Sequence, residues 1–561
     1  MHLMKIYKLN CLVVFILSVF FSGCTATTGD IYVIRGGTII DGNGTTGAIG
    51  NLMIKEGKIF RLGMDKTTDN VREIDAHGLI VAPGFIDVHN HSDKAIGNPG
   101  KRLNEGYIRQ GVTTIVGGPD GAYNPSTIKA RIAAYQKNGI GTNVAFYVGH
   151  NGIRREVMQQ DQQRAPTVEE MDQMKALVQE GMELGAVGFS TALVYSPGIY
   201  SNTEEIVELS KVAARYNGIY DSHTRSPVHA FDHSVGEAIA VAEGAMIPAK
   251  IAHFKAVGLH NAGMMQQMVA QINEARRRGI AIFSDQYPYD AALIIDLTEL
   301  IILPPDLQEI YADRDLDPHD GEDRRLFDLK RALQDPANRQ QIKAISENAG
   351  NDGFSWIKAT GYNCFRITNS QDYPDLIGQY LSDLAVQRGA DPFDVVCDLI
   401  IQSAFPVFIT LGAIKEKDVR DLLTQPWNMI ASDGGYTEPS RPSYGHPRST
   451  GTFPRVLGHY VRELNLLSIE EAIRKMTSLP ADVIGLADRG RVAEGLAADI
   501  VIFDPRTIID RSSYIMPHIY ADGILHVFVN GVPVLLDGKL TGKAPGKYLR
   551  SSGSKIYDRI K

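Results

Sequence analysis

The residues best suited to chemistry are histidines and aspartates that follow apolar runs. His89 and His91 stand two positions apart, so in a strand both imidazoles point to the same side and can reach one ion. His223, His253 and Asp433 each follow a later apolar run. Taken singly, each could be a satisfied buried histidine or a helix-capping aspartate. Together, these donors in matching positions predict a metal site.

Eight apolar runs can supply the strands that position these residues. Helical stretches lie between most of them, and in one such stretch Thr167 and Glu170 match a capping box. Alternation of strands and helices from about residue 79 to 435 predicts a (β/α)₈ TIM barrel of α/β class, with chemistry at the carboxyl ends of its strands. The eight runs end in GFIDVHNH (84–91), TTIVGGPD (113–120), NVAFYVGH (143–150), AVGFSTAL (186–193), GIYDSHT (218–224), AKIAHFK (249–255), AIFSDQY (281–287) and NMIASDG (428–434).

Segments outside the regular alternation predict two additions to the barrel, which we assign to residues 81–489. Residues 31–80 and 490–545 consist of short alternating stretches with turn glycines. We expect these two flanks to form one small β-sandwich from both chain ends. The stretch between the seventh and eighth strands, about 290–427, is much longer than one helix and its loops require. It predicts an inserted helical subdomain or lid.

The start of the chain has the pattern of an export signal. Two lysines precede an apolar run from Leu9 to Phe21, which is short for a membrane span and is followed by Ser22, Gly23 and Cys24. Small residues before a cysteine predict a lipoprotein-type signal peptide over 1–23. Cys24 would then carry the lipid, residues 24–30 would be a tether, and the protein would be anchored to the bacterial cell envelope, facing the periplasm. A plain cleaved signal or a retained anchor is the alternative.

Composition narrows the class of protein. The chain has 561 residues, of which 44% are hydrophobic and 22% charged, so it is long and apolar enough for a barrel and a smaller domain. Its formal net charge of -8 offers no basic surface for phosphates, which excludes nucleic acid as an expected partner. After signal cleavage and lipidation of Cys24, only Cys364 and Cys397 remain as thiols. They predict buried free thiols or a single bridge rather than a disulfide framework.

The chain resembles the D-aminoacylase (N-acyl-D-amino-acid deacylase) family of the amidohydrolase superfamily. The resemblance covers nearly all of the mature chain, and the order and joint presence of its motifs make it specific. These motifs are APGFIDVHNHSD, QGVTTIVGG, GHNGIR, VGFSTALVYSPGIYSNTEEI, DSHTRS, AHFKAVG, SDQYPY, ASDGG, HPRSTGTFPRVLG, RKMTSLPA and RGRVAEGLAADIVIFDP.

The resemblance implies a zinc site of one or two ions. It implies that His89 and His91 form one half of this site with Asp433, while His223 and His253 hold the other half. Carried over by motif, Asp433 is also the general base and general acid.

Further residues are implied to bind the substrate. Tyr195, Lys255 and Arg448 match the positions that bind the substrate's α-carboxylate, a role that suits a phenol, an ammonium and a guanidinium. For Lys255 and Arg448 the alternative is that of ordinary surface cations. His150, at the end of the third strand, could donate to the developing oxyanion or support the site from behind, and structural packing is its alternative.

One position departs from the family pattern. Many members carry a cysteine after the second strand as a zinc ligand, where this chain has Asp120 in a glycine-flanked turn. A carboxylate is an acceptable zinc ligand and can bridge two ions, although Asp120 could instead be only a turn residue. The number of metals therefore stays open. The fourth strand ends in Phe189-Ser190-Thr191. This segment offers no lysine for the carbamylated bridge of hydantoinases and dihydroorotases.

The expected activity is zinc-dependent hydrolysis of N-acyl-D-amino acids or D-terminal dipeptides to a carboxylate and a free D-amino acid. Within enzymes, the alternative is a cyclic-amide or isoaspartyl-dipeptide hydrolase of the dihydroorotase or hydantoinase kind. Outside enzymes, it is an inactive lipid-anchored binding protein, against which the five retained metal-competent residues argue. The preferred side chain and acyl group stay open.

Overall fold

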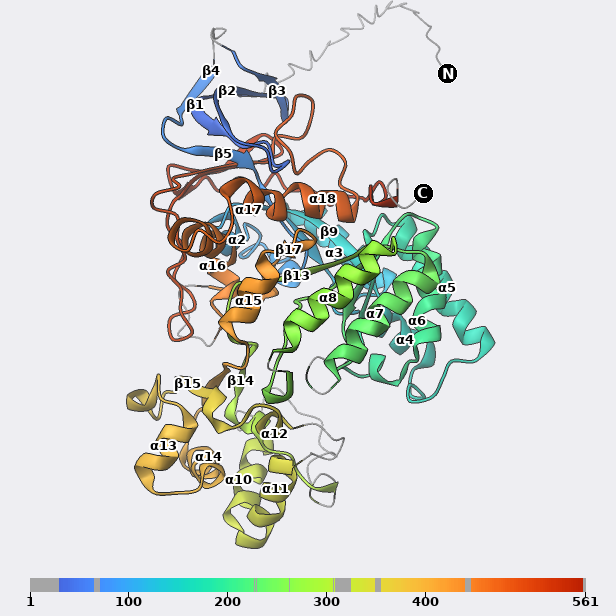
Figure 1. The fold of residues 1–561 in the computed structure, drawn as a ribbon, viewed down its shortest axis with the longest axis vertical. Coiled ribbons are helices and arrows are strands. Elements are labelled where there is room, and N and C mark those ends of the chain that lie inside the picture. Colours follow the sequence, from blue (N-terminus) through green and yellow to red (C-terminus); the bar gives the residue numbers. More distant parts are fainter. Residues whose placement is uncertain are drawn as a thin grey trace, which may run out of the picture.

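A computed structural model of the chain describes residues 30–64, 71–226, 228, 230–261, 263–305, 307, 324–348, 355–438 and 445–557. The expected signal peptide and Cys24 lie outside these residues. Figure 1 shows three regions, which are a small sheet at the top, a barrel in the middle and an inserted subdomain at the bottom. Within the described residues, no helix has the length and apolar character needed to cross a membrane.

The middle region is an eight-stranded parallel barrel, as the sequence predicts. Neighbouring strands pair in sequence order around it, and side chains of the second and third strands are buried along their whole length. Burial on both faces is typical of parallel strands that helices cover, which explains why these runs are apolar throughout. The strands are β6 (Phe85–Asp87), β8 (Val112–Gly117), β9 (Asn143–Gly149), β10 (Gly188–Ala192), β11 (Ile219–His223), β12 (Ala249–Ile251), β13 (Ile282–Gln286) and β17 (Asn428–Ile430).

The barrel closes through short segments beyond its first and last strands. Within the described part, no ladder joins β17 directly to β6. Instead β7 (Asn90–His91) pairs in parallel with β18 (Gly434–Gly435), and the Asp433 N–H donates to the His89 carbonyl at 2.9 Å. The seam of the barrel is therefore made by residues next to the expected metal ligands.

Helices cover the outside of the barrel and connect its strands (Figure 1). The predicted capping box is confirmed, because the Thr167 side chain accepts the Glu170 N–H and the Glu170 side chain accepts the Thr167 N–H. The main helices are α3 (Pro125–Asn138), α4 (His150–Met158), α5 (Val168–Glu183), α6 (Thr203–Ala214), α7 (Phe231–Ala245), α8 (Met264–Arg277), α15 (Glu416–Leu423), α16 (Arg448–Arg455), α17 (Ile469–Met476) and α18 (Ser478–Ile484).

Strands from both chain ends form the small sheet. β5 of the amino-terminal part pairs antiparallel with β19 of the carboxyl-terminal part, and apolar side chains such as Ile34, Leu52, Ile500 and Phe528 form a core of their own. The expected joining of the two ends is thus confirmed. The strands are β1 (Ile31–Ile39), β2 (Ala48–Lys55), β3 (Lys58–Leu62), β4 (Val71–Asp75), β5 (Ile80–Pro83), β19 (Ile500–Phe503), β20 (Ile524–Val529), β21 (Val532–Leu536) and β22 (Lys539–Leu540).

The insertion between β13 and α15 is confirmed, but it is not purely helical. A three-stranded antiparallel sheet in the order β14-β16-β15 accompanies its helices. It reaches the strand-end side of the barrel, where the Gly258 N–H donates to the Ala413 carbonyl at 3.4 Å. Cys364 and Cys397, both in this region, are free thiols. Its elements are β14 (Leu293–Asp296), α10 (Arg324–Gln334), α11 (Pro336–Asn348), α12 (Trp356–Thr360), β15 (Phe365–Asn369), α13 (Leu381–Arg388), α14 (Pro392–Gln402) and β16 (Phe408–Leu411).

Candidate active site

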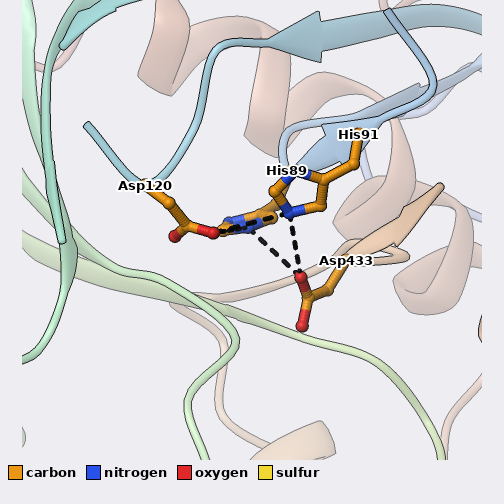
Figure 2. A group of neighbouring side chains, drawn as sticks. All are labelled: His89, His91, Asp120 and Asp433. Atoms are coloured by element: carbon orange, nitrogen blue, oxygen red, sulfur yellow. Dashed lines mark hydrogen bonds and ion pairs between the residues drawn. The ribbon is translucent and has the colours of Figure 1, made fainter. Parts of the chain in front are cut away.

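The metal-competent residues converge at the carboxyl ends of the barrel strands. They form two groups that share one aspartate, and within each group the ligand atoms all lie within 4.8 Å of one another. Figure 2 shows the first group, in which two histidines from one segment face two aspartates from different strands. The groups are His89, His91, Asp120 and Asp433, and Asp120, His223 and His253.

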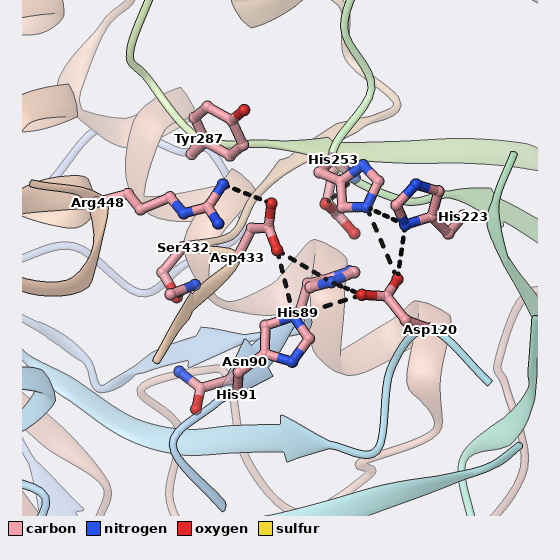
Figure 3. Close-up of polar contacts among 12 residues, drawn as sticks. His89, Asn90, His91, Asp120, His223, His253, Tyr287, Ser432, Asp433 and Arg448 are labelled. Carbon is pink, nitrogen blue, oxygen red and sulfur yellow. Dashed lines mark hydrogen bonds and ion pairs between the residues drawn. The ribbon is translucent and has the colours of Figure 1, made fainter. Parts of the chain in front are cut away.

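Asp120 lies between the two groups and turns one oxygen toward each. Its Oδ2 is 3.6 Å from His89 Nε2 and 3.5 Å from His91 Nε2. Its Oδ1 is 3.2 Å from His223 Nδ1 and 3.7 Å from His253 Nε2. Figure 3 shows the carboxylate between the histidine pairs. The geometry therefore suits a bridging ligand better than a residue that only forms a turn.

The surroundings of His89 test whether the site suits a metal. Its side chain is fully buried, and neither ring nitrogen has a hydrogen-bond partner among the residues that the structure describes. Its Nε2 lies 3.4 Å from Asp433 Oδ1, beyond an ordinary hydrogen bond. A buried polar atom without a partner is costly, and a cation between these donors would remove that cost. Imidazole nitrogens with carboxylate oxygens are a zinc donor set, so the residues fit one or two zinc ions.

The charges at the site favour a cation as well. Burial opposes ionisation of Asp120 and Asp433, but the neighbouring histidines hold the pKa of Asp120 well below its usual range, and Arg448 together with histidines does the same for Asp433. Burial alone would lower the pKa of His89, yet the carboxylates of Asp120 and Asp433 raise it to about 9. The site thus concentrates negative charge where the histidine nitrogens meet.

Three of the candidate ligands have a left-handed backbone, which non-glycine residues rarely adopt. The φ angles are 57° at Asp120, 33° at His253 and 51° at Asp433. Each costs about 1–3 kcal/mol and persists only where surrounding contacts enforce it. At Asp120, buried Ser190 does so, because its hydroxyl accepts the Gly121 N–H at 3.1 Å and donates to the Gly118 carbonyl at 3.0 Å.

The two cations expected to bind a carboxylate lie beside Asp433. Arg448 Nη1 is 2.7 Å from Asp433 Oδ2, and its guanidinium lies 4.9 Å from the ring centre of Tyr287. Lys255 Nζ lies 5.3 Å from the same ring and donates to the His253 carbonyl at 2.9 Å. Burial lowers the pKa of Lys255 to about 8. Tyr195 is 52% exposed and packs edge-on against His223, with 5.0 Å between the ring centres.

His150 does not take part in this arrangement of contacts. Its side chain is fully buried, and its Nε2 lies 2.7 Å from a carboxylate oxygen of Glu205, which also accepts from Arg154. These contacts match the packing alternative, and the structure does not bring His150 into either ligand group. The next residue, Asn151, serves the site instead, because its amide donates to the carbonyl of Ala192 at 3.1 Å and to that of Tyr195 at 3.4 Å.

Sequence reasoning also missed buried residues that contact the candidate ligands and cations or lie close to them. The ring of Tyr287 lies near both cations, and Tyr287 stands in the SDQYPY motif. Lys250 is fully buried and pairs with Asp221 and Asp285. A charged residue within an apolar strand run was the available signal for Lys250.

Comparison with known proteins places this site in a family. The amidohydrolase family matches residues 367–535. A D-aminoacylase from Alcaligenes xylosoxydans xylosoxydans is 31% identical over 539 residues, which cover 92% of this chain and 97% of that relative. The chain belongs to the D-aminoacylase family.

Solved structures of this D-aminoacylase family agree along the whole fold. An N-acyl-D-glutamate deacylase from Bordetella bronchiseptica, complexed with zinc and a phosphonate that mimics the tetrahedral intermediate, is 30% identical with a TM-score of 0.72. The similarity covers 93% of this chain and 99% of that one. A D-aminoacylase described with a binuclear metal centre is 30% identical over 92% of this chain and 99% of its own, with a TM-score of 0.70.

Proposed function

We propose that this protein hydrolyses the amide bond of N-acyl-D-amino acids, including D-terminal dipeptides, with one or two zinc ions. The products are a carboxylate and a free D-amino acid. The observation that carries the proposal is the position of Arg448 and Lys255 beside a two-part metal site. A metal site serves many hydrolases, whereas an adjacent pair of cations also suits a substrate with a free α-carboxylate.

Zinc, when bound, polarises the scissile carbonyl and makes a water nucleophilic near neutral pH. The chain itself moves the proton. Asp433 Oδ1 lies 3.3 Å from His91 Nε2 and 3.4 Å from His89 Nε2, and Arg448 Nη1 contacts Oδ2 at 2.7 Å, so Arg448 orients the carboxylate at the metal site, where it accepts the proton of the attacking water. Asp433 then gives that proton to the leaving nitrogen, because an amine cannot depart as an anion.

The remaining residues orient the substrate. The guanidinium of Arg448 and the ammonium of Lys255 bind the α-carboxylate, and Tyr195 contacts it from the half-exposed side near His223. Fixing the carboxylate at this edge orients the substituents at Cα relative to the ions, which is how the site would select one stereoisomer.

A substrate panel tests this proposal. Zinc-loaded protein is offered N-acetyl and N-formyl derivatives of D- and L-amino acids, D-terminal dipeptides, dihydroorotate and hydantoins. Release of free amine is measured for the open-chain amides, and ring opening to the N-carbamoyl acid is measured for the cyclic ones. We expect turnover of the D-derivatives alone. Turnover of cyclic amides instead would favour the alternative activity, and zinc-loaded protein without turnover of any compound would favour a binding protein.

We also propose that the protein is exported and anchored to the cell envelope through a lipid on Cys24. The support is the sequence pattern of a short apolar run followed by Ser22, Gly23 and Cys24. Cys24→Ser is expected to shift the protein from the membrane fraction to a soluble or unprocessed form. A mature amino terminus at another residue, found by mass spectrometry, would contradict this proposal.

A further inference from the structure

Two buried carboxylates, Asp87 and Asp285, lie next to the ligand segments without belonging to either ligand group. We propose that each is the positioning residue of one half of the metal centre, with Asp87 serving His89, His91 and Asp433 and Asp285 serving His253 and its partner His223. This inference rests on the zinc site of the proposed function. It assigns a separate buried carboxylate to the ligands of each half of that site.

Asp285 accepts a backbone hydrogen bond just beyond the end of the ladder between β12 and β13. The pairing of β12 with β13 stops at Ile251 and Ser284. Beyond it, the His253 N–H donates to Asp285 Oδ1 at 2.7 Å, and the Phe254 N–H donates to the Asp285 carbonyl at 2.7 Å. Asp285 is fully buried, so without its carboxylate the His253 N–H would lack this acceptor. This contact holds the left-handed turn that directs the His253 imidazole to the site.

Lys250 orients the Asp285 carboxylate that accepts the His253 N–H. Its ammonium is fully buried and contacts Asp285 Oδ2, and it lies 2.7 Å from Asp221 Oδ1. Asp285 Oδ2 contacts Lys250 while its Oδ1 accepts the His253 N–H, so Lys250 supports the orientation in which Oδ1 faces this N–H. Removing one member of such a buried cluster leaves another charge uncompensated, so the orientation of Asp285 depends on the whole cluster.

Asp87 has the corresponding place behind the other half. It is fully buried at the end of β6. Its Oδ1 accepts the Ser432 N–H at 2.9 Å, and its Oδ2 accepts from the Ser432 hydroxyl at 2.5 Å and from the Asn90 amide at 2.9 Å. Asn90 stands between His89 and His91, and Ser432 directly precedes Asp433 (Figure 3). One carboxylate thus fixes the ligand segments of the first and last strands together.

The two carboxylates share no hydrogen-bond donor among the residues that the structure describes. Asp87 accepts from Asn90, from Ser432 and, at 3.4 Å, from the His89 N–H. Asp285 accepts from the His253 N–H and from Lys250. A purely structural role would affect both halves together in proportion to stability. A positioning role predicts that each substitution weakens one ion selectively, by roughly tenfold or more, as is typical for groups that orient metal ligands.

The test uses the full mature chain loaded with ¹¹³Cd²⁺. Ions per chain are counted after dialysis against graded chelator, and ¹¹³Cd NMR separates the two halves, with His91→Ala and His223→Ala assigning the two resonances. The parent is expected to hold two ions. Asp285→Asn should lose the resonance assigned by His223→Ala first, and Asp87→Asn should lose the one assigned by His91→Ala.

Controls separate positioning from folding. Asp499 is also buried and bonded, to Arg489 and the Asn530 N–H, so Asp499→Asn is a matched variant that should lower the melting temperature and leave both ions. If Asp285→Asn fails to fold, Asp221→Asn replaces it in the comparison of the two ions, and if Asp87→Asn fails to fold, Ser432→Ala replaces it. Both replacements are expected to perturb the ligand segments less.

Two results would overturn the inference. One is loss of both ions in step with the melting temperature, and the other is retention of both ions by both variants while the parent binds two. A parent that binds no ion and hydrolyses no substrate would instead refute the zinc-dependent function itself.

Discussion

Asp120 gives the site its two-part character at the scale of the residue. A carboxylate has two oxygens, and here they point to different histidine pairs, at 3.5–3.6 Å on one side and 3.2–3.7 Å on the other. Its position two residues beyond Gly118, in a turn held by Ser190, keeps both oxygens directed into the barrel. A side chain with one donor atom would have to share that atom between both ions.

This arrangement makes zinc content depend on residue 120. We expect Asp120→Ala to retain less zinc against a chelator than the parent, because both halves lose a donor while His223 and His253 remain. Asp120→Cys should recover much of the loss, since a thiolate is a good zinc ligand. Zinc per chain, measured in the three proteins, decides this. Equal, chelator-resistant zinc in the alanine variant would show that Asp120 only forms a turn.

Asp433 is expected to matter more for rate than for metal. Asp433→Asn keeps the shape of the side chain and an oxygen near the histidines, but an amide cannot accept and return a proton. Activity on an N-acyl-D-amino acid should fall by roughly two orders of magnitude or more, while the fold and most of the metal remain. Activity within about threefold of the parent would remove Asp433 from the proton transfers.

The candidate ligands that the structure brings together could be selected from the sequence because each stands at or just after the end of a buried strand, and parallel strands end at one edge. Lys250, Asp221 and Asp285 could not be assigned in that way. They come from three different strands, and only their distances show that their charges compensate one another. The contact of His150 with Glu205 could not be foreseen either, because Glu205 lies 55 residues further along the chain.

At the scale of elements, the segment after β10 depends on α4. Asn151, in the first turn of this helix, donates to the carbonyls of Ala192 and Tyr195 and accepts the Ala192 N–H at 3.2 Å. It is buried, so these bonds are not exchanged for water. The position of the Tyr195 phenol at the mouth of the site is thus set by a helix that contributes no ligand itself.

Loss of this support should reduce substrate binding rather than metal binding. Asn151→Ala removes these side-chain hydrogen bonds and is expected to raise KM by about tenfold, equivalent to roughly 1.4 kcal/mol, with zinc content unchanged.

A matched control comes from α5. Thr167→Ala removes the cap of that helix, and it should cost about 1 kcal/mol of stability and leave KM as it is. Equal KM values for Asn151→Ala and the parent would contradict the role of Asn151.

The elements themselves differed in how far the sequence could predict them. Seven of the eight barrel strands lie within the predicted segments, and β8 begins one residue before its segment, because strands buried on both faces are apolar throughout. The sheet of the insertion could not be predicted, since its strands have only 4 or 5 residues and their side chains are partly exposed. So short a stretch has too few positions for a period to be recognised.

The whole molecule is a barrel whose ring is completed at a seam. β7 and β18 pair through two residue pairs, which is a short ladder for the junction of the first and last strands. Asp87 adds its bonds to Ser432 across the same seam. Since His91 and Asp433 lie on opposite sides of it, an ion held by both would join the two edges.

Metal removal is therefore expected to destabilise the fold as well as stop catalysis. A ligand that binds only the folded state stabilises it by about 2.7 kcal/mol when its free concentration is 100-fold above the dissociation constant. Calorimetry of zinc-loaded and chelated protein should show a lower melting temperature without metal, and hydrogen exchange should quicken first at β7 and β18. Identical melting temperatures with proven loss of zinc would contradict this.

An ion bound at the seam would also restrict the conformations of the unfolded chain. His91 and Asp433 are 342 residues apart in sequence. An ion that ties them closes a loop that contains nearly the entire barrel, and cross-links of long loops restrict the unfolded chain most in theory. Because Cys364 and Cys397 are free, they supply no covalent closure of this kind. The metal would thus act as a reversible cross-link. It could form only after the first and last strands have paired, so that binding of the ion would indicate a closed barrel.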